Sequence, residues 1–361
     1  MTAKQDRLTG FSERNAVMKK IIRLCICLLL SASFLCPAGS LAEPMNFSTF
    51  SAARKYVTEN QPAELDLGET KFSPEQLVEL KRMLPDGAVM TFSSKWGKAP
   101  YTSADTSLNL NVTTKQLTPD VVECLIELCP DLHEIHMAGH REMSNRQVIP
   151  LLEKYPDIEF TWLVNFASAY SVSSDATAYS TFKREKSGKE LSSRDLEPLK
   201  YCRGLKALDL GHHAITDLDF LTYLPDLEFL ILGDNDITDI SPLAELPHLQ
   251  YIEIFMNPIT DVSPLAGHTE LLDLNIVRTR VTDLSPLESC TALERLWCSF
   301  TKVPEDNVEH IRTALPGCIV NNTAQHSTAD GWRDHPRYKQ YIPQLKSHIW
   351  TGFTDAEQPG E

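Results

Sequence analysis

The residues best suited to chemistry lie in one short run, HEIHMAGH, which spans His133 to His140. A helical zinc site of the His-Glu-x-x-His type needs its two histidines four residues apart, so that both imidazoles leave the same helical face. In this run the second histidine comes one residue too early, as His-Glu-Ile-His. Three histidines in eight residues could still collect zinc. A metal-dependent enzyme that uses the run is therefore a hypothesis to test.

The same run also fits a β-strand. Leu132, Ile135 and Met137 would point into a core, which leaves the first two histidines on the surface and His140 in a turn. We therefore favour a structural role for the run and predict no metal and no cofactor.

Other catalytic patterns are missing from the sequence. It has no Gly-x-Ser-x-Gly, no phosphate-binding loop and no Cys-x-x-Cys. His212 and His213 fall at turn positions, as His140 does. Thr-Asp pairs could pass for catalytic carboxylates, but they recur in register in four copies, as turn-stabilising residues do. The copies are Thr216-Asp217, Thr238-Asp239, Thr260-Asp261 and Thr282-Asp283. We predict that the protein is not an enzyme.

The Thr-Asp pairs belong to a repeat of 22 residues. Its first place is held by Leu205, Leu227, Leu249, Leu271 and Leu293. Its fourth and sixth places are apolar in each copy except for Cys298, and its eleventh place is Ile or Val before each Thr-Asp pair. Ser-Pro follows in three of the copies. Repetition at a fixed period of this length indicates a solenoid.

Each copy of the repeat is predicted to form one coil of that solenoid. Places one, four and six point inward from a short strand, and the strands of successive copies pair side by side. At the ninth place Asn235 and Asn257 can satisfy backbone groups where the chain turns. The Ser-Pro step stops the strand and begins a tight or 3₁₀ segment on the opposite face. Stacked coils then bury a core that no single copy could bury alone.

The pattern LxxLxLxxNxITDISPLAxLxx resembles the leucine-rich repeats of the internalin type, which occur on bacterial secreted and surface proteins. The close match covers residues 205–292, with a diverged copy from Leu293 onward. The resemblance implies an α/β leucine-rich-repeat solenoid with a concave parallel β-sheet and a helical or 3₁₀ convex side. It also implies a non-catalytic role in binding proteins through the concave face.

The N-terminal part carries a longer relative of this unit. Helix starts at Ser73 and Thr118 precede strand-like runs, which suggests strand–helix repeats in one solenoid along the chain. The expected runs are 88–92, 132–137 and 158–166, and the expected irregular linkers are 93–106 and 167–190. The predicted divisions are 1–42 as an N-terminal extension and signal peptide, 43–190 as longer repeats, 191–320 as regular repeats and 321–361 as a C-terminal capping segment.

The C-terminal segment breaks the repeat. Its aromatic and charged stretch from Gly331 to Tyr338 suggests a segment that folds back over the last coil, because an open solenoid end needs a cover. It holds no sortase motif and no hydrophobic tail, so we expect no wall or membrane anchor.

The N-terminus has the layout of a secretory signal peptide. A basic stretch from Met18 to Arg23 precedes an apolar run of 12 residues, Leu24 to Leu35, and then Ser40-Leu41-Ala42. We expect Met18 to be the true start, cleavage after Ala42, and a secreted, extracellular product. Retention as an anchor and a lipoprotein reading through Cys36 are weaker alternatives.

The net charge and the positions of the cysteines argue against two further features, nucleic-acid binding and disulfide bonds. A net charge of −15 argues against sequence-independent nucleic-acid binding, which needs clustered Lys and Arg. Six cysteines follow Ala42, but Cys124 and Cys129 would be about 8 Å apart on a helix, beyond easy bridging. Cys202, Cys290, Cys298 and Cys318 lie where the repeat needs small buried groups, so we expect buried free thiols.

A partner would contact the outward strand positions of the concave sheet. Their large apolar residues form a candidate site, because exposed apolar patches usually mark contact surfaces. The site residues are Phe229, Ile231, Tyr251, Phe255, Met256, Trp297 and Phe300.

Two alternatives remain open for this face. The C-terminal segment, with Trp332, Tyr338 and Tyr341, could fold into the concavity and cover the patch. Trp297 and Tyr251 could instead stack on sugars of a glycan or cell wall. The resemblance favours a protein partner on a cell surface or in the medium.

Overall fold

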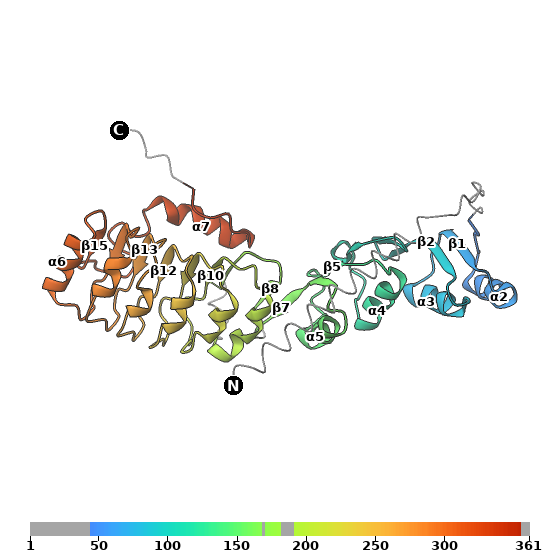
Figure 1. Ribbon diagram of the computed structural model, residues 1–361, viewed down its shortest axis with the longest axis horizontal. Coiled ribbons are helices and arrows are strands. Elements are labelled where there is room, and N and C mark those ends of the chain that lie inside the picture. The colour runs from blue at the N-terminus through green and yellow to red at the C-terminus, as the bar shows by residue number, and fades with distance from the viewer. Residues whose placement is uncertain (1–43, 168–169, 182–190, 355–361) are drawn as a thin grey trace, which may run out of the picture. The chain divides into compact units, whose positions relative to one another are not determined.

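The computed structural model describes residues 44–167, 170–181 and 191–354 (Figure 1). The expected signal peptide lies outside these residues. Among those described, no helix is both long and apolar enough to cross a membrane.

The N-terminal part begins with helix α2 (Phe50–Asn60) and a three-stranded sheet. In that sheet β1 (Glu64–Glu69) pairs parallel with β2 (Val89–Trp96), which pairs antiparallel with β3 (Ala99–Thr102). Helix α3 (Pro74–Met83) connects β1 to β2 and begins at the predicted capping box, where the Ser73 N–H donates to Gln76 Oε1 at 2.9 Å. The expected linker over 93–106 is wrong, because the β2–β3 hairpin occupies most of it.

Strand–helix repeats follow, as predicted. Strands β4 (Ser107–Asn109), β5 (Glu134–His136) and β6 (Glu159–Thr161) form a parallel sheet, and α4 (Pro119–Leu128) and α5 (Asn145–Lys154) connect them. A 3₁₀ turn, η1 (Leu110–Val112), follows β4. The run expected over 158–166 breaks at Trp162. Beyond the break, β7 (Leu163–Asn165) pairs antiparallel with β8 (Ser171–Ser173).

The regular coils form one parallel sheet of seven strands in the order β15 to β9. Its strands are β9 (Ala178–Ser180), β10 (Ala207–Asp209), β11 (Phe229–Ile231), β12 (Tyr251–Glu253), β13 (Asp273–Asn275), β14 (Arg295–Trp297) and β15 (Ile319–Asn321). From β10 to β14 each residue pairs with the residue 22 positions later. The leucine-rich-repeat fold is thus confirmed for this part. The prediction of one continuous solenoid is wrong, because the strands of the described residues divide among four sheets.

The side opposite the strands carries short 3₁₀ helices and α6 (Glu305–Ala314) (Figure 1). The 3₁₀ helices are η3 (Ser193–Tyr201), η4 (Asp219–Tyr223), η5 (Ser241–Glu245), η6 (Ser263–Leu265) and η7 (Ser285–Ser289). The Thr-Asp pairs start four of them, since each aspartate accepts the backbone N–H two residues later at 2.7 to 2.9 Å. This geometry accounts for the carboxylates as turn-stabilising groups.

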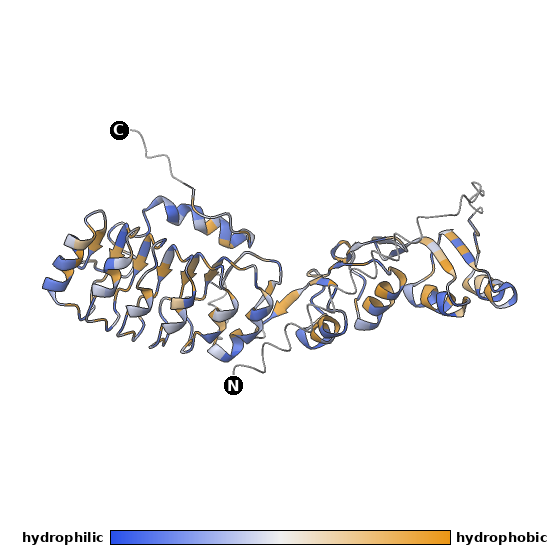
Figure 2. Ribbon diagram, viewed as in Figure 1, coloured by the Kyte–Doolittle hydropathy of each residue, from blue (hydrophilic) through white to orange (hydrophobic). Residues whose placement is uncertain are grey.

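The core of the coils lies between the strands and the 3₁₀ helices. The fourth-place residues Leu208, Leu230, Ile252, Leu274 and Leu296 are fully buried. Hydropathy follows this division, with hydrophobic residues on the strands and hydrophilic ones on the outward helical faces (Figure 2). All six cysteines after residue 42 are free and four are buried, as expected; Cys124 and Cys318 are partly exposed.

Candidate functional site

The concave face of the seven-stranded sheet is filled by the chain's own C-terminal segment, defined here as residues 322–354. This segment includes helix α7 (Pro336–Ser347), which contacts β9 and β10 at the opposite end of the sheet from β15. The expectation that it caps the last coil is therefore wrong. It runs back across the strands instead (Figure 1).

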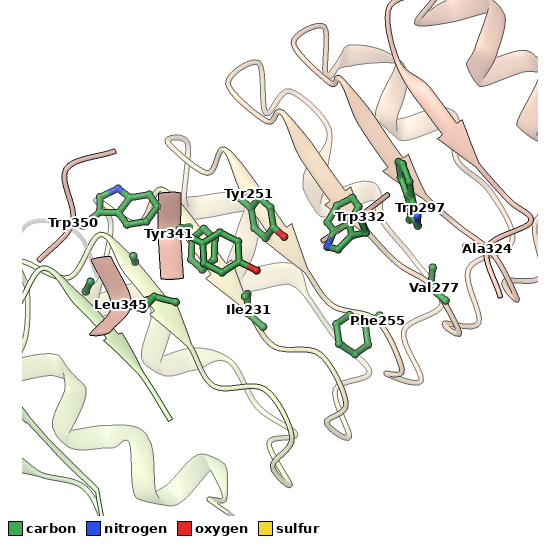
Figure 3. Close-up of a cluster of buried hydrophobic side chains, with 13 residues drawn as sticks. Ile231, Tyr251, Phe255, Val277, Trp297, Ala324, Trp332, Tyr341, Leu345 and Trp350 are labelled. Atoms are coloured by element: carbon green, nitrogen blue, oxygen red, sulfur yellow. The ribbon is translucent and has the colours of Figure 1, made fainter. Parts of the chain in front are cut away.

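The segment buries five of the seven predicted site residues. Phe229, Ile231, Tyr251, Phe255 and Trp297 are each at most 6% exposed. They pack with Trp332, Tyr341, Leu345 and Trp350 of the C-terminal segment in one apolar cluster (Figure 3). The expectation of an open aromatic patch is wrong for these five, and intramolecular cover, the alternative drawn from the sequence, describes them. Met256 and Phe300 stay exposed, at 41% and 58%.

Aromatic rings of the sheet and of the C-terminal segment pack against one another in this interface. Phe229 stacks on Tyr251 with ring centroids 4.7 Å apart, and the Tyr341 ring lies 4.6 Å from Phe229. Trp332 lies 5.2 Å from Trp297 and 5.7 Å from Tyr251. Aromatic pairs at such distances stabilise by roughly 0.5–1.5 kcal/mol each beyond the area they bury.

Two buried carboxylates anchor the segment to the sheet. Glu253 is fully buried and accepts hydrogen bonds from Trp332 Nε1 at 2.9 Å and Arg333 Nη2 at 3.0 Å. The Tyr251 hydroxyl also donates to Glu253. Burial, together with the charge of Glu253, raises the pKa of Tyr251 well above its ordinary value, which keeps that hydroxyl protonated as a donor.

The second carboxylate is Asp273, which is also fully buried. It accepts from Arg295 Nε at 2.6 Å on the neighbouring strand and from Arg337 Nη1 at 2.9 Å on α7. Arg337 also pairs with Glu294. Removing both arginines would leave the buried charge of Asp273 unpaired, and loss of the partner of a buried ion pair costs about 3–5 kcal/mol. These anchors were not predicted from the sequence, although acidic residues among aromatic strand positions and two arginines four residues apart were visible signals.

The two exposed site residues belong to a column of residues that lies just beyond the carboxyl ends of strands β10 to β14. We call His212, Asp234, Met256, Arg278 and Phe300 the rim column; each holds the eighth place of its coil. All five have left-handed backbone, with φ between 54° and 62°. Neighbours in the column interact: His212 Nδ1 lies 2.9 Å from Asp234 Oδ2, and the Arg278 guanidinium lies 4.7 Å from the Phe300 ring centroid.

Comparison with known proteins identifies the coils. The family model described as leucine-rich repeats, two copies, matches residues 225–267. The coils are leucine-rich repeats. A search of curated proteins found no match.

Solved leucine-rich-repeat structures also align with the chain. Internalin C2 of Listeria monocytogenes has a TM-score of 0.34 and 23% identity over 62% of this chain and 85% of its own. A second internalin from that organism has a TM-score of 0.30 and 17% identity, with coverage of 78% and 86%. A leucine-rich-repeat protein of Leptospira interrogans has 0.35 and 18%, with coverage of 72% and 71%. The fold assignment rests on the repeats themselves.

The histidine run lies outside these leucine-rich repeats, on and after β5. Leu132, Ile135 and Met137 are buried, as the strand reading predicted. His140 ends the turn that follows β5, as predicted, and is buried: its Nδ1 lies 2.9 Å from Glu142 Oε1 and its Nε2 2.9 Å from the Leu110 carbonyl. Both ring nitrogens therefore have protein partners. No group of three or more potential metal ligands occurs among the described residues.

Of the two turn histidines, only His212 is exposed. His213 is buried, with Nε2 2.9 Å from Thr181 Oγ1 and Nδ1 accepting the Leu191 N–H at 3.3 Å. Burial, with a smaller effect of His212, lowers the pKa of His213 to about 4. His213 is therefore neutral near pH 7 and serves as a structural residue.

Proposed function

We propose that this is an exported, non-catalytic leucine-rich-repeat protein that binds a protein partner through its rim column. Leucine-rich repeats form scaffolds whose surfaces typically bind proteins. The observation that carries the proposal is the exposure of Met256 and Phe300. Both are large apolar side chains, and they flank Arg278 on the same edge of the sheet.

The rim column has the composition of a protein contact surface. It brings two apolar side chains together with a guanidinium and an imidazole–carboxylate pair. Aromatic residues, Met and Arg are enriched in protein interfaces. Each position also keeps a left-handed backbone without glycine, a conformation that is unfavourable for most side chains. Each position of the rim column therefore has a side chain, although glycine would adopt this left-handed backbone without strain.

The other functions weighed from the sequence have less support. Sugar stacking needs open aromatic faces, and Trp297 and Tyr251 lie under the C-terminal segment. Catalysis through the histidine run needs convergent ligands or a free base, and both nitrogens of His140 are engaged. Export is part of the proposal because of the signal-peptide layout of residues 1–42.

Replacement of the two apolar rim residues tests the contact surface. The variant Met256→Asn/Phe300→Asn keeps the backbone favourable, because Asn tolerates the left-handed region. Photo-crosslinking to cell-surface and culture-medium proteins should give a defined adduct with the parent, and the variant should lose it. The matched control is Tyr223→Asn, since Tyr223 is similarly exposed at 45% but lies on a 3₁₀ helix.

Two results would reject the rim column as the contact surface for a partner. One is an adduct of equal yield from parent and rim variant. The other is loss of the adduct in the Tyr223→Asn control as well. All three proteins must first show equal thermal stability, so that the comparison reports on contact alone.

A further inference from the structure

The C-terminal segment occupies the concave face as a bound peptide would. The coils have their own core between strands and 3₁₀ helices, and its residues, such as Leu230 and Leu274, point away from the segment. The apolar cluster that holds the segment is a second layer on the opposite face of the sheet (Figure 3). The aromatic strand residues of that layer lie outside the coil core, and their contacts are with the segment that occupies the concave face.

The segment is held almost entirely by side chains. Among the described residues, its backbone–backbone hydrogen bonds to the sheet converge on one acceptor, the His348 carbonyl, which receives the N–H groups of Thr177 and Ala178 at 3.2 Å. Its other polar contacts use at least one side chain, such as Asn275 Nδ2 to the Ser327 carbonyl and Trp350 Nε1 to Glu228. It adds no strand to the sheet. Contacts of this kind are those of a helix lying in a groove.

One stripe of the segment supplies its ionic contacts and part of its apolar contacts, beside those of Trp332 and Trp350. Arg333, Arg337, Tyr341 and Leu345 are spaced by four residues, which places the last three on one face of α7. The sheet is complementary to this stripe along its length. Glu253 pairs with Arg333, and Asp273 with Glu294 pairs with Arg337. Phe229 then receives the Tyr341 ring.

We propose that the concave face is a docking site for a protein segment whose helix carries a basic, an aromatic and an aliphatic residue at four-residue spacing, with a second basic residue just before the helix. The C-terminal segment holds this site in cis, and a partner with the same stripe displaces it. This inference adds a second surface to the rim column and does not depend on it. The fully buried Glu253 and Asp273 make the site selective, because a segment without matching cations would leave Glu253 without an ionic partner and Asp273 with Arg295 alone.

Tethering sets the conditions for displacement. A short connection gives a covalently attached ligand an effective concentration in the millimolar range. A partner segment in solution therefore competes poorly until the connection is cut or the partner is itself concentrated on a surface. Cutting the connection removes this advantage and makes the exchange measurable.

The test uses the full chain with a site-specific protease sequence inserted between Gln325 and His326, which are both exposed. After cleavage, a fluorescent peptide of residues 326–354 is added in excess, and anisotropy reports its uptake. We expect the cut chain to exchange its segment for the labelled peptide, while the uncut chain takes up little.

Peptide variants test the chemistry of the stripe. A peptide with Arg337→Glu should bind at least about thirtyfold more weakly, because it places a like charge against Asp273. The matched control is Lys339→Glu, which makes the same charge change at an exposed position of α7 and should bind like the parent peptide. An unrelated peptide whose helix carries the Arg-x₃-Tyr-x₃-Leu stripe, with a further arginine four residues earlier in the turn before the helix, should compete, whereas the same residues in scrambled order should not.

Several results would overturn the proposal. The cut chain could retain its segment without exchange, or it could lose the circular dichroism of its coils, which would make the segment an integral part of the fold. Equal binding of the Arg337→Glu and Lys339→Glu peptides, or failure of the striped peptide to compete, would reject the stated partner chemistry. The rim variant Met256→Asn/Phe300→Asn should leave uptake unchanged, which separates this result from the test of the rim column.

Discussion

At Gly233 the missing side chain leaves room for the ring of Phe255. A Cβ placed there would lie 2.4 Å from Phe255 Cζ, whereas a Cβ at Gly211, the same place one coil earlier, meets nothing nearer than 3.4 Å. We expect Gly233→Ala to lower the free energy of unfolding by about 1–3 kcal/mol through overpacking, and Gly211→Ala to change it little. Urea denaturation measures both. Equal losses would contradict this account, as would a Gly233→Ala loss that persists in a Phe255→Leu background.

The buried imidazole of His213 predicts a dependence of stability on pH. Its pKa of about 4 in the folded chain is below the value of about 6.5 in the unfolded chain. Between these values the unfolded state binds more protons, so stability is complete above about pH 6.5 and falls as the pH drops. By pH 5 the loss should reach about 2 kcal/mol.

The variant His213→Asn isolates this contribution, because Asn holds the same place in the next two coils at Asn235 and Asn257. Unfolding free energies of parent and variant at pH 7 and pH 5 give the difference. The variant should show a smaller loss on acidification than the parent. The same loss in both proteins would remove His213 as its source.

In the repeat element, one buried amide ties adjacent coils together. Asn257 Oδ1 accepts the Ile237 N–H at 3.0 Å, and Asn257 Nδ2 donates to the carbonyls of Leu232 and Ile254 at 2.9 and 3.1 Å. Asn257→Ala leaves these buried groups unpaired and should cost about 3 kcal/mol. Thr279→Ala, at the same place one coil later, removes one hydrogen bond, from Thr279 Oγ1 to the Ile276 carbonyl, and should cost about 1 kcal/mol. Chemical denaturation ranks the two, and a larger loss for Thr279→Ala would contradict the role given to the asparagine.

Some strands could be predicted from the sequence and others could not. The strands of the regular coils were predictable because every inward place must be apolar, and this need repeats every 22 residues. The β2–β3 hairpin was missed although β2 alternates exposed and buried residues up to Trp96, and Gly97 then provides a positive φ for the turn.

No periodic pattern in the sequence indicated that the C-terminal segment covers the concave face. The hydrogen bond from Trp332 to Glu253 joins residues 79 positions apart. The outward strand positions therefore could be named as contact residues, but their occupant could only be one of several alternatives. Met256 and Phe300 stayed exposed because the eighth place lies at the edge of the sheet, beyond the strand residues that the segment covers.

Across the whole molecule, the seven-stranded sheet has an apolar layer on each face. Parallel sheets occur almost only with both faces covered. The coil core covers one face here, and the cluster formed with the C-terminal segment covers the other. This arrangement explains why a chain with a net charge of −15 places Arg333 and Arg337 in the C-terminal segment. The two cations offset the carboxylates Glu253 and Asp273, which the second layer removes from water.

The proposed export concerns the whole chain, and the proposed signal peptide should be removed by cleavage at one place. Cleavage after Ala42 takes away six Lys and Arg and two Asp and Glu, which leaves 28 basic against 47 acidic residues and a net charge of −19. We expect a bacterial host to release a product that begins at Glu43, as N-terminal sequencing and intact mass would report. Ala42→Lys should block processing, because the cleavage site needs a small residue there, while Ala52→Lys, beyond the site on exposed helix α2, should be processed normally. A released product that still contains residues 1–42, or processing of both variants alike, would contradict the signal-peptide assignment.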